Sequence, residues 1–297
     1  MIESYLITRD QYGLAERERR ARDFTLDSGI AHIRLDTCNR LEYYWGQGRI
    51  PLDTARHLYR VASGLESALI GEKAILGQVR QAYLEACGRY RLSGALNRLF
   101  QSAIQVGREV RARTSISQGA VSHSQIAAGL LEETGFDFER RTIAILGIND
   151  LTVSILKFLR RHRTLNLLLS TRNAAKALDI ARRFGGETFP VTERAAQLQR
   201  CDCLIAATRA PHYLVQTSDL SDRCRPLMII DLSVPRCIDP RAAALPGITL
   251  YNIEDIERRS VHSREARRGE IERAAAIIEG ALARLERWQN HRAAGRA

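Results

Sequence analysis

The fold is decided by the stretch Arg141-Thr142-Ile143-Ala144-Ile145-Leu146-Gly147, a short apolar run that ends on glycine. Similar runs follow at 166–170, 203–207 and 227–232, and helical stretches separate them at 152–161, 174–184 and 193–199. Short apolar strands that alternate with helices are typical of a parallel sheet covered by helices. We therefore expect an α/β protein with a doubly wound, Rossmann-type domain over residues 136–258.

The turn after the first expected strand reads Gly147-Ile148-Asn149-Asp150-Leu151-Thr152. A dinucleotide-binding fingerprint has glycine at its first, third and sixth positions, and only Gly147 matches. Asn149 tolerates positive φ, but its side chain is expected to crowd the approach of a pyrophosphate. Asp150 adds a negative charge at the same place. Two interpretations stay open, an NADP-binding site and a Rossmann domain with a structural role only.

Ser170-Thr171-Arg172 follows the second expected strand. An arginine and hydroxyls at this position favour the 2′-phosphate of NADP, whereas an acidic residue favours NAD. If the domain binds a dinucleotide, the sequence therefore predicts NADP.

Residues 1–135 predict an α+β domain. Strand-like runs occur at 4–7 and 32–35, an amphipathic helix is expected near 14–24, and helices are expected over 53–113, the first of them carrying an apolar pattern from Leu58 to Leu69. The joint to the next domain is expected within 134–140.

The segment 259–297 predicts one long amphipathic helix over 263–289. Its apolar stripe at helical spacing comprises Ile271, Ala274, Ile278, Ala281, Leu285 and Trp288. Such a stripe must pack on something, either the chain's own domains or another chain, so an oligomer through this helix stays open.

Cys38 lies in Thr37-Cys38-Asn39-Arg40, where a strand is expected to lead into a short polar turn. A nearby guanidinium stabilises a thiolate, which is the nucleophilic form of cysteine. Arg40 is also suited to orient a substrate carboxylate through a bidentate pair. The alternative is a buried cysteine at a strand end.

Two further groups of polar residues are candidates for the same site. His57 could protonate a reacting carbonyl or keep the thiol ionised, or it could be an ordinary surface histidine. Polar groups near one glycine-containing turn could bind an amino-acid ammonium and carboxylate, or could only cap a helix; they are Ser67, Glu72, Lys73 and Gln78.

The formal net charge is +11, and only three of the 45 basic residues are lysines. A basic surface attracts polyanions, so tRNA is a permitted partner. No apolar run has the length of a membrane span and no signal peptide is apparent, which predicts a cytoplasmic protein. The six cysteines show no disulfide framework and no zinc spacing, so reduced thiols and no metal are expected.

Taken together, these residues resemble the glutamyl-tRNA reductase family. The matching motifs occur in the family's order over almost the whole chain: Thr37-Cys38-Asn39-Arg40-x-Glu42-x-Tyr44, Arg60 to Ser67, Gly71-Glu72, Ile75 to Val79, Leu99-Phe100-Gln101, Val110-Arg111, Ala120-Val121-Ser122, Ile230 to Arg236 and Leu250 to Asp255.

The resemblance implies that Cys38 attacks the ester carbonyl of glutamyl-tRNA, and that NADPH reduces the resulting thioester to glutamate-1-semialdehyde. This reaction opens the five-carbon route to tetrapyrroles. His57 matches a histidine important for activity, and Gly147 to Thr152 match the NADP loop. Substrate-contacting positions match Thr37, Asn39, Arg40, Ser67, Glu72 and Gln78. The semialdehyde aminomutase, which acts next, is a candidate partner.

The chain departs from the family in three places. The sequence ends soon after the expected spinal helix, where the family continues into a dimerisation domain, so we expect a short member without that domain. Lys73-Ala74 stands where the family has Pro-Gln in the substrate pocket, and Ile7-Thr8-Arg9 begins a stretch that differs after the first strand. Together with the altered glycine loop, these changes indicate a diverged member. Other functions stay open: reduction of another aminoacyl-tRNA or acyl carrier, hydrolysis of the thioester, or tRNA binding without catalysis.

Overall fold

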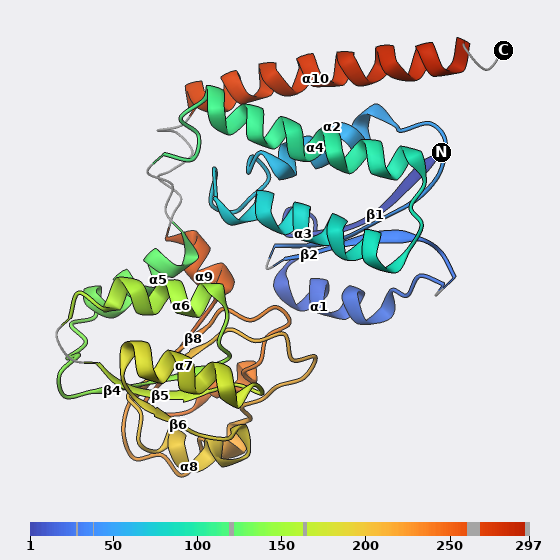
Figure 1. Cartoon of the computed structure of the whole chain (residues 1–297). Coiled ribbons are helices and arrows are strands. Elements are labelled where there is room, and N and C mark those ends of the chain that lie inside the picture. The colour runs from blue at the N-terminus through green and yellow to red at the C-terminus, as the bar shows by residue number, and fades with distance from the viewer. Residues whose placement is uncertain (28, 38, 119–121, 163–164, 260–267, 295–297) are drawn as a thin grey trace. The chain divides into compact units, whose positions relative to one another are not determined.

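The computed structural model describes residues 1–27, 29–37, 39–118, 122–162, 165–259 and 268–294. The chain forms two compact units (Figure 1). The first unit joins Met1–Val121 with Val261–Ala297, and the second consists of Ser122–Ser260. The expected combination of an α+β domain, a doubly wound domain and a long helix is confirmed. None of the described helices has the length and apolar character needed to cross a membrane.

The first unit contains a three-stranded antiparallel sheet of order β1-β3-β2. Its strands are β1 (Ile2–Thr8), β2 (His32–Thr37) and β3 (Arg40–Gly46), and helix α1 (Leu14–Asp23) follows β1. The expected strands at 4–7 and 32–35 are confirmed. The expected polar turn is short, because the chain after it returns at once as β3. This strand is central, with Leu6 and Leu35 both opposite Glu42.

Three helices pack on this sheet and on each other: α2 (Leu52–Ala62), α3 (Ala74–Arg89) and α4 (Gly94–Arg113). The apolar pattern from Leu58 to Leu69 does not form one helix, because α2 ends at Ala62. Gly64 turns the chain with a φ of +79°, and a Cβ on it would lie 3.3 Å from the Cα of Gly71. The N–H of Gly71 donates to the carbonyl of Gly64 at 3.0 Å, which closes the segment between them into a compact loop.

The long helix α10 (Arg268–Ala294) packs on α2 and α4 of the same unit (Figure 1). Ala274, Ile278 and Leu285 of the predicted stripe are almost fully buried. The side-chain amide of Gln289 accepts from the Ile50 N–H at 2.7 Å and donates to the Ile50 carbonyl at 3.1 Å. The stripe therefore covers the core of the chain's own first unit.

The second unit is a six-stranded parallel sheet of order β6-β5-β4-β7-β8-β9. The strands are β4 (Thr142–Leu146), β5 (Asn166–Ser170), β6 (Glu187–Thr188), β7 (Cys203–Ala206), β8 (Leu227–Asp231) and β9 (Ile248–Asn252). The helices are α5 (His123–Glu133), α6 (Asp150–Leu159), α7 (Ala174–Phe184), α8 (Arg194–Leu198) and α9 (Ile253–Arg258). The four expected strands are confirmed, and β6 and β9 are additional. Helix α5 packs on α6 and α9, so residues from 122 onward belong to this unit.

Candidate functional site

Strand β3 presents three polar side chains on one face. Alternate residues of a strand point to the same side, which brings Arg40, Glu42 and Tyr44 together. Glu42 and Tyr44 are fully buried, and only 3% of the Arg40 side chain is exposed. Buried polar groups in such a place must satisfy one another, because no water can do so.

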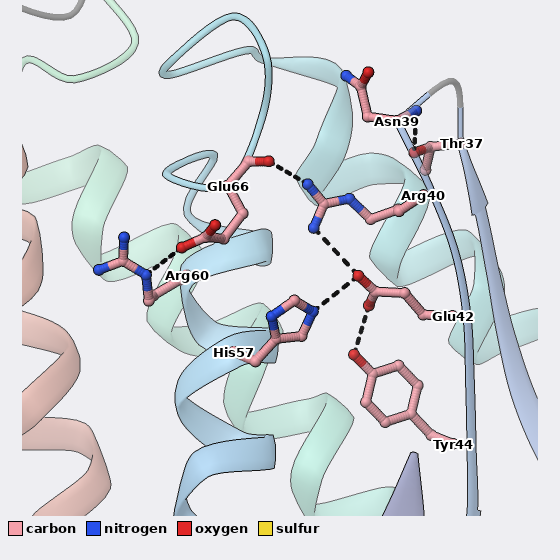
Figure 2. Close-up of polar contacts among 8 residues, drawn as sticks. All are labelled: Thr37, Asn39, Arg40, Glu42, Tyr44, His57, Arg60 and Glu66. Atoms are coloured by element: carbon pink, nitrogen blue, oxygen red, sulfur yellow. Dashed lines mark hydrogen bonds and ion pairs between the residues drawn. The ribbon is translucent and has the colours of Figure 1, made fainter. Parts of the chain in front are cut away.

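The carboxylate of Glu42 is the centre of this group (Figure 2). It accepts from the Tyr44 hydroxyl at 2.5 Å and from a terminal nitrogen of Arg40 at 3.3 Å. The Nε2 atom of His57, on α2, lies 2.8 Å from the same carboxylate. We call these four residues the Glu42 network. It joins the central strand to the first helix after the sheet.

The network keeps Glu42 ionised although it is fully buried. Burial by itself raises the pKa of this carboxyl, but His57, Arg40 and Tyr44 together lower it below its ordinary value. Burial and the neighbouring carboxylate raise the pKa of Tyr44 well above its ordinary value. Tyr44 therefore stays a neutral donor. Since a carboxylate oxygen only accepts hydrogen bonds, Nε2 of His57 carries hydrogen, and its Nδ1 is left as the second functional atom of the ring.

Arg40 is occupied within the protein. Besides Glu42, its guanidinium donates to the main-chain carbonyl of Glu66 (Figure 2). Its buried Nε has no hydrogen-bond partner among the described residues, and the expected pair between Arg40 and a substrate carboxylate stays a prediction. The buried guanidinium ties the loop after α2 to the carboxylate of Glu42.

The chain neighbours of Cys38 form a tight turn, while Cys38 itself lies outside the described residues. The N–H of Asn39 donates to the Thr37 hydroxyl at 3.3 Å (Figure 2). Asn39 is 4% exposed, and its side-chain oxygen has no hydrogen-bond partner among the described residues. The buried hydroxyl of Ser63 likewise has none within the described chain. An unsatisfied buried oxygen beside the Thr37–Asn39 turn can accept a hydrogen bond from a ligand.

The loop between α2 and α3 and the first turns of α3 carry the other expected substrate residues. Ser67 is buried, Glu72 and Gln78 are partly exposed, and Lys73 and Ala74 are exposed. Arg60 pairs with the Glu66 carboxylate. From α4, Arg111 donates to the carbonyls of Glu72 at 3.0 Å and Lys73 at 2.9 Å. Arg60 and Arg111 thus hold the two ends of the loop. Burial lowers the pKa of Arg111.

In the second unit, the expected cofactor residues lie at the carboxyl edge of the parallel sheet. The strand order reverses between β4 and β7, and dinucleotides bind at such a switch point. Gly147 follows β4 with a φ of +90°, and a Cβ on it would lie 2.3 Å from the Ala207 carbonyl oxygen after β7. Only glycine fits this turn. Its position satisfies the first requirement of a dinucleotide site.

Asn149 occupies the start of α6 without using the positive φ that asparagine tolerates. Its φ is −146°, so tolerance of positive φ is not used, and its side chain turns inward to cap α6. Its Oδ1 accepts from the N–H groups of Leu151 at 3.0 Å and Thr152 at 3.1 Å. The Thr152 hydroxyl accepts from the Asn149 N–H at 2.9 Å, which completes a capping box. The side chain therefore occupies helix amides that a phosphate could otherwise use.

The remaining cofactor candidates divide into buried and exposed groups. Ile148, Thr152 and Ser170 are buried, and the Ser170 hydroxyl has no partner among the described residues. Asp150 and Arg172 are exposed, with Leu151 and Thr171 between these extremes. The guanidinium after β5 suits a 2′-phosphate, and the Gly147 turn suits a pyrophosphate. The edge therefore fits an NADP-type dinucleotide, although the N–H groups of Asn149, Leu151 and Thr152 at the start of α6 already donate hydrogen bonds within the protein.

Residues beyond those predicted also belong to the site. Glu42 and Tyr44 were part of a recognised motif but had no assigned role; their alternate spacing after Arg40 was the available signal. Arg111 was also part of a recognised motif, but no spacing in the sequence indicates its contact with the loop between α2 and α3. Among the described cysteines, burial raises the pKa of Cys201 to about 12 and of Cys203 well above its ordinary value, so neither suits nucleophilic chemistry. The described residues contain no cluster with the composition of a metal site.

Comparison with known proteins gives two family matches. Residues 50–114 match the family described as "Glutamyl-tRNAGlu reductase, N-terminal domain", and residues 130–259 match "Shikimate / quinate 5-dehydrogenase". The second match agrees with a dehydrogenase-type NAD(P)-binding domain.

Individual relatives match over most of the chain. A glutamyl-tRNA reductase of Thermus thermophilus is 38% identical over 277 residues, which are 93% of this chain and 68% of that protein. One from Deinococcus radiodurans is 34% identical over 284 residues, covering 86% and 81%. The solved glutamyl-tRNA reductase of Methanopyrus kandleri is 30% identical, with a TM-score of 0.49 over 96% of this chain and 79% of that one.

Proposed function

The chain belongs to the glutamyl-tRNA reductase family, and we propose that it reduces glutamyl-tRNA to glutamate-1-semialdehyde through a thioester on Cys38. The observation that carries the proposal is the Glu42 network on β3, which begins two residues after Cys38. It holds an oriented histidine against the strand that begins two residues after Cys38 in the sequence. A carboxylate, an imidazole and a thiol are the parts of a nucleophilic acyl-transfer site.

The first step is a transfer of the glutamyl group from oxygen to sulfur. The Cys38 thiolate attacks the ester carbonyl, the C–S bond forms, and the C–O bond to the terminal ribose of tRNA breaks. Because Nε2 of His57 is bound to Glu42, Nδ1 is the atom that takes the thiol proton and returns it to the leaving ribose oxygen. Glu42 holds the ring in this tautomer and stabilises its protonated form.

Polar residues of the same unit bind the glutamyl group. The side-chain oxygen of Asn39 is buried and has no partner among the described residues, so it accepts from the substrate's ammonium group. Thr37, Ser67, Glu72 and Gln78 supply the other polar contacts. Arg40 acts through Glu42 and the Glu66 carbonyl and is a positioning residue.

NADPH is the proposed cofactor of the second unit. When bound, it supplies the hydride that converts the thioester to an aldehyde. The Gly147 turn accepts the pyrophosphate beside the N–H groups of Ile148 and Asp150, and Thr171 with Arg172 holds the 2′-phosphate. A free aldehyde is reactive, which makes the enzyme that consumes it a candidate partner.

Incubation with glutamyl-tRNA, with and without NADPH, tests the proposal. Without NADPH, mass spectrometry of the intact protein should show a glutamyl adduct on Cys38, and with NADPH the semialdehyde should form. Cys38→Ser should remove both signals, lowering the rate by a factor on the order of a thousand or more. Cys87→Ser, which changes an exposed thiol of the same unit, is the matched control and should keep full activity.

Two outcomes would contradict the proposal in different ways. Semialdehyde formation that survives Cys38→Ser excludes the covalent step. Release of glutamate alone, at the same rate with and without NADPH, supports the hydrolytic alternative, which the engaged start of α6 favours.

A further inference from the structure

The start of α6 uses its own side chains where a dinucleotide site leaves backbone N–H groups for phosphate. The amides of Asn149, Leu151 and Thr152 are all engaged in the capping box. Those of Ile148 and Asp150 donate no hydrogen bond among the described residues. Pyrophosphate binding at a helix start depends on such groups, so three of the five are already taken.

Asn149 is also fixed at its other end. Its Nδ2 donates to the Ala207 carbonyl at 2.8 Å, across the switch point between β4 and β7. The side chain therefore spans from the helix amides to the neighbouring strand end. An oxygen of Asn149 lies against the amides in the way that a phosphate oxygen does.

The backbone does not require this arrangement. Asn149 has an extended φ and ψ of −146° and −176°, a conformation that any residue adopts. A smaller side chain at this position would therefore keep the turn and release two amides. The effect of Asn149 on a ligand comes from its hydrogen bonds and not from the path of the chain.

We propose that Asn149 is an internal competitor for the cofactor's pyrophosphate, and that NADPH binds fully only when this side chain leaves the α6 amides. The inference rests on the proposed function, since it concerns the same cofactor. The exposed carboxylate of Asp150 adds repulsion at the same place. Binding therefore depends mainly on the 2′-phosphate, which Arg172 holds.

Asn149→Ala in the full chain tests this inference, with binding measured by calorimetry. The dissociation constant of NADPH should fall about tenfold, the value of one hydrogen bond to a charged group. Binding of adenosine 2′-monophosphate, which has no pyrophosphate, should not change. The melting temperature of the second unit should fall by a few degrees, because a helix cap is lost.

Asn252→Ala is the matched control. Asn252 caps α9 with the same capping box, accepting from Glu254 at 2.8 Å and Asp255 at 3.2 Å, but it follows the edge strand β9. This variant should lower the melting temperature similarly and leave NADPH binding unchanged.

The outcomes separate the inference from the proposed function. If Asn149→Ala and the parent bind NADPH equally well, the internal competition is excluded while the reductase stands. If neither protein binds NADPH, the inference fails, since release of the amides should improve binding, and the reductase proposal fails with it.

Discussion

The polar centre of the first unit is a fully buried carboxylate, whereas that of the second is the neutral amide of Asn149 at a half-buried helix start. In both units the protein's own groups occupy atoms that a ligand could use. Glu42 is held by a guanidinium, an imidazole and a hydroxyl. Asn149 is held by neutral donors within three residues and by one carbonyl.

The difference lies in the free energy needed to open each site. Removal of one partner from a buried charge pair costs about 3–5 kcal/mol, but loss of a helix cap costs about 1 kcal/mol. The first site is therefore rigid and pre-organised for chemistry. The second can exchange its internal contacts for those of a ligand.

The largest effect should come from Glu42→Gln. The change leaves Arg40 buried without its counter-charge, so the free energy of unfolding of the first unit should fall by about 3–5 kcal/mol. Glu66→Gln is the matched control, because its partner Arg60 is partly exposed and the loss should stay below about 1 kcal/mol. Denaturant unfolding measures both. Equal losses of unfolding free energy in the two variants would remove the contrast between the rigid Glu42 network and the adaptable site at the start of α6.

The second effect is a pH dependence of opposite sign in the two units. Burial raises the pKa of Asp231 to about 6 from 3.8, so its folded form binds a proton more tightly than its unfolded form. The associated stability, about 3 kcal/mol, is present below pH 3.8 and is lost as the pH rises through about 6. The pKa of Glu42 is lowered in the folded first unit. Its ionised form therefore stabilises that unit at pH values above the ordinary pKa of a glutamate, and this stabilisation is lost as the pH falls through the lowered value.

Hydrogen exchange of each unit between about pH 4.5 and 7 measures this difference, after correction for intrinsic exchange rates. The second unit should lose stability with rising pH, and Asp231→Asn should remove that slope. A slope that is the same in the variant would show that other groups cause it.

His57→Gln should slow the chemistry with little effect on stability. Glutamine can still donate to Glu42, but it has no atom that takes a proton, so formation of the thioester should slow about a hundredfold. An unchanged rate of thioester formation would mean that another group moves the proton, and the Glu42 network would then be structural only.

The smallest effect should come from Arg172→Ala in the adaptable site. Loss of the guanidinium should raise the dissociation constant of NADPH about tenfold and leave that of NADH unchanged. Arg182→Ala, at the other end of α7, removes the same charge from an exposed position and serves as control. A similar loss for both variants would indicate a general attraction of phosphate to a basic surface.

The sequence predicts the bounds of those elements that are marked by an apolar run or stripe between polar residues. Strands β4 and β5 and helix α7 have the expected bounds, because each is an apolar run or stripe between polar residues. Strand β9 was not expected, since most of its side chains are partly exposed and show no apolar run. Helix α2 ends early because Gly64 turns the chain, although the apolar spacing continues to Leu69.

The candidate site was predictable in its residues but not in their contacts. The alternation of Arg40, Glu42 and Tyr44 on a strand places them on one face, and this can be read directly. That Arg40 reaches the Glu66 carbonyl depends on how the loop after α2 closes. The inward turn of Asn149 was overlooked, although an asparagine followed three residues later by threonine resembles a helix cap.

The first unit is built from both ends of the chain, and the second lies entirely between them. During synthesis, α10 leaves the ribosome only after the six-stranded sheet has been made. Until then, the surface of α2 and α4 that receives Ala274, Ile278 and Leu285 has no cover. Because this cover comes from residues far along the chain, we expect the core of the first unit to be completed only after α10 has been made.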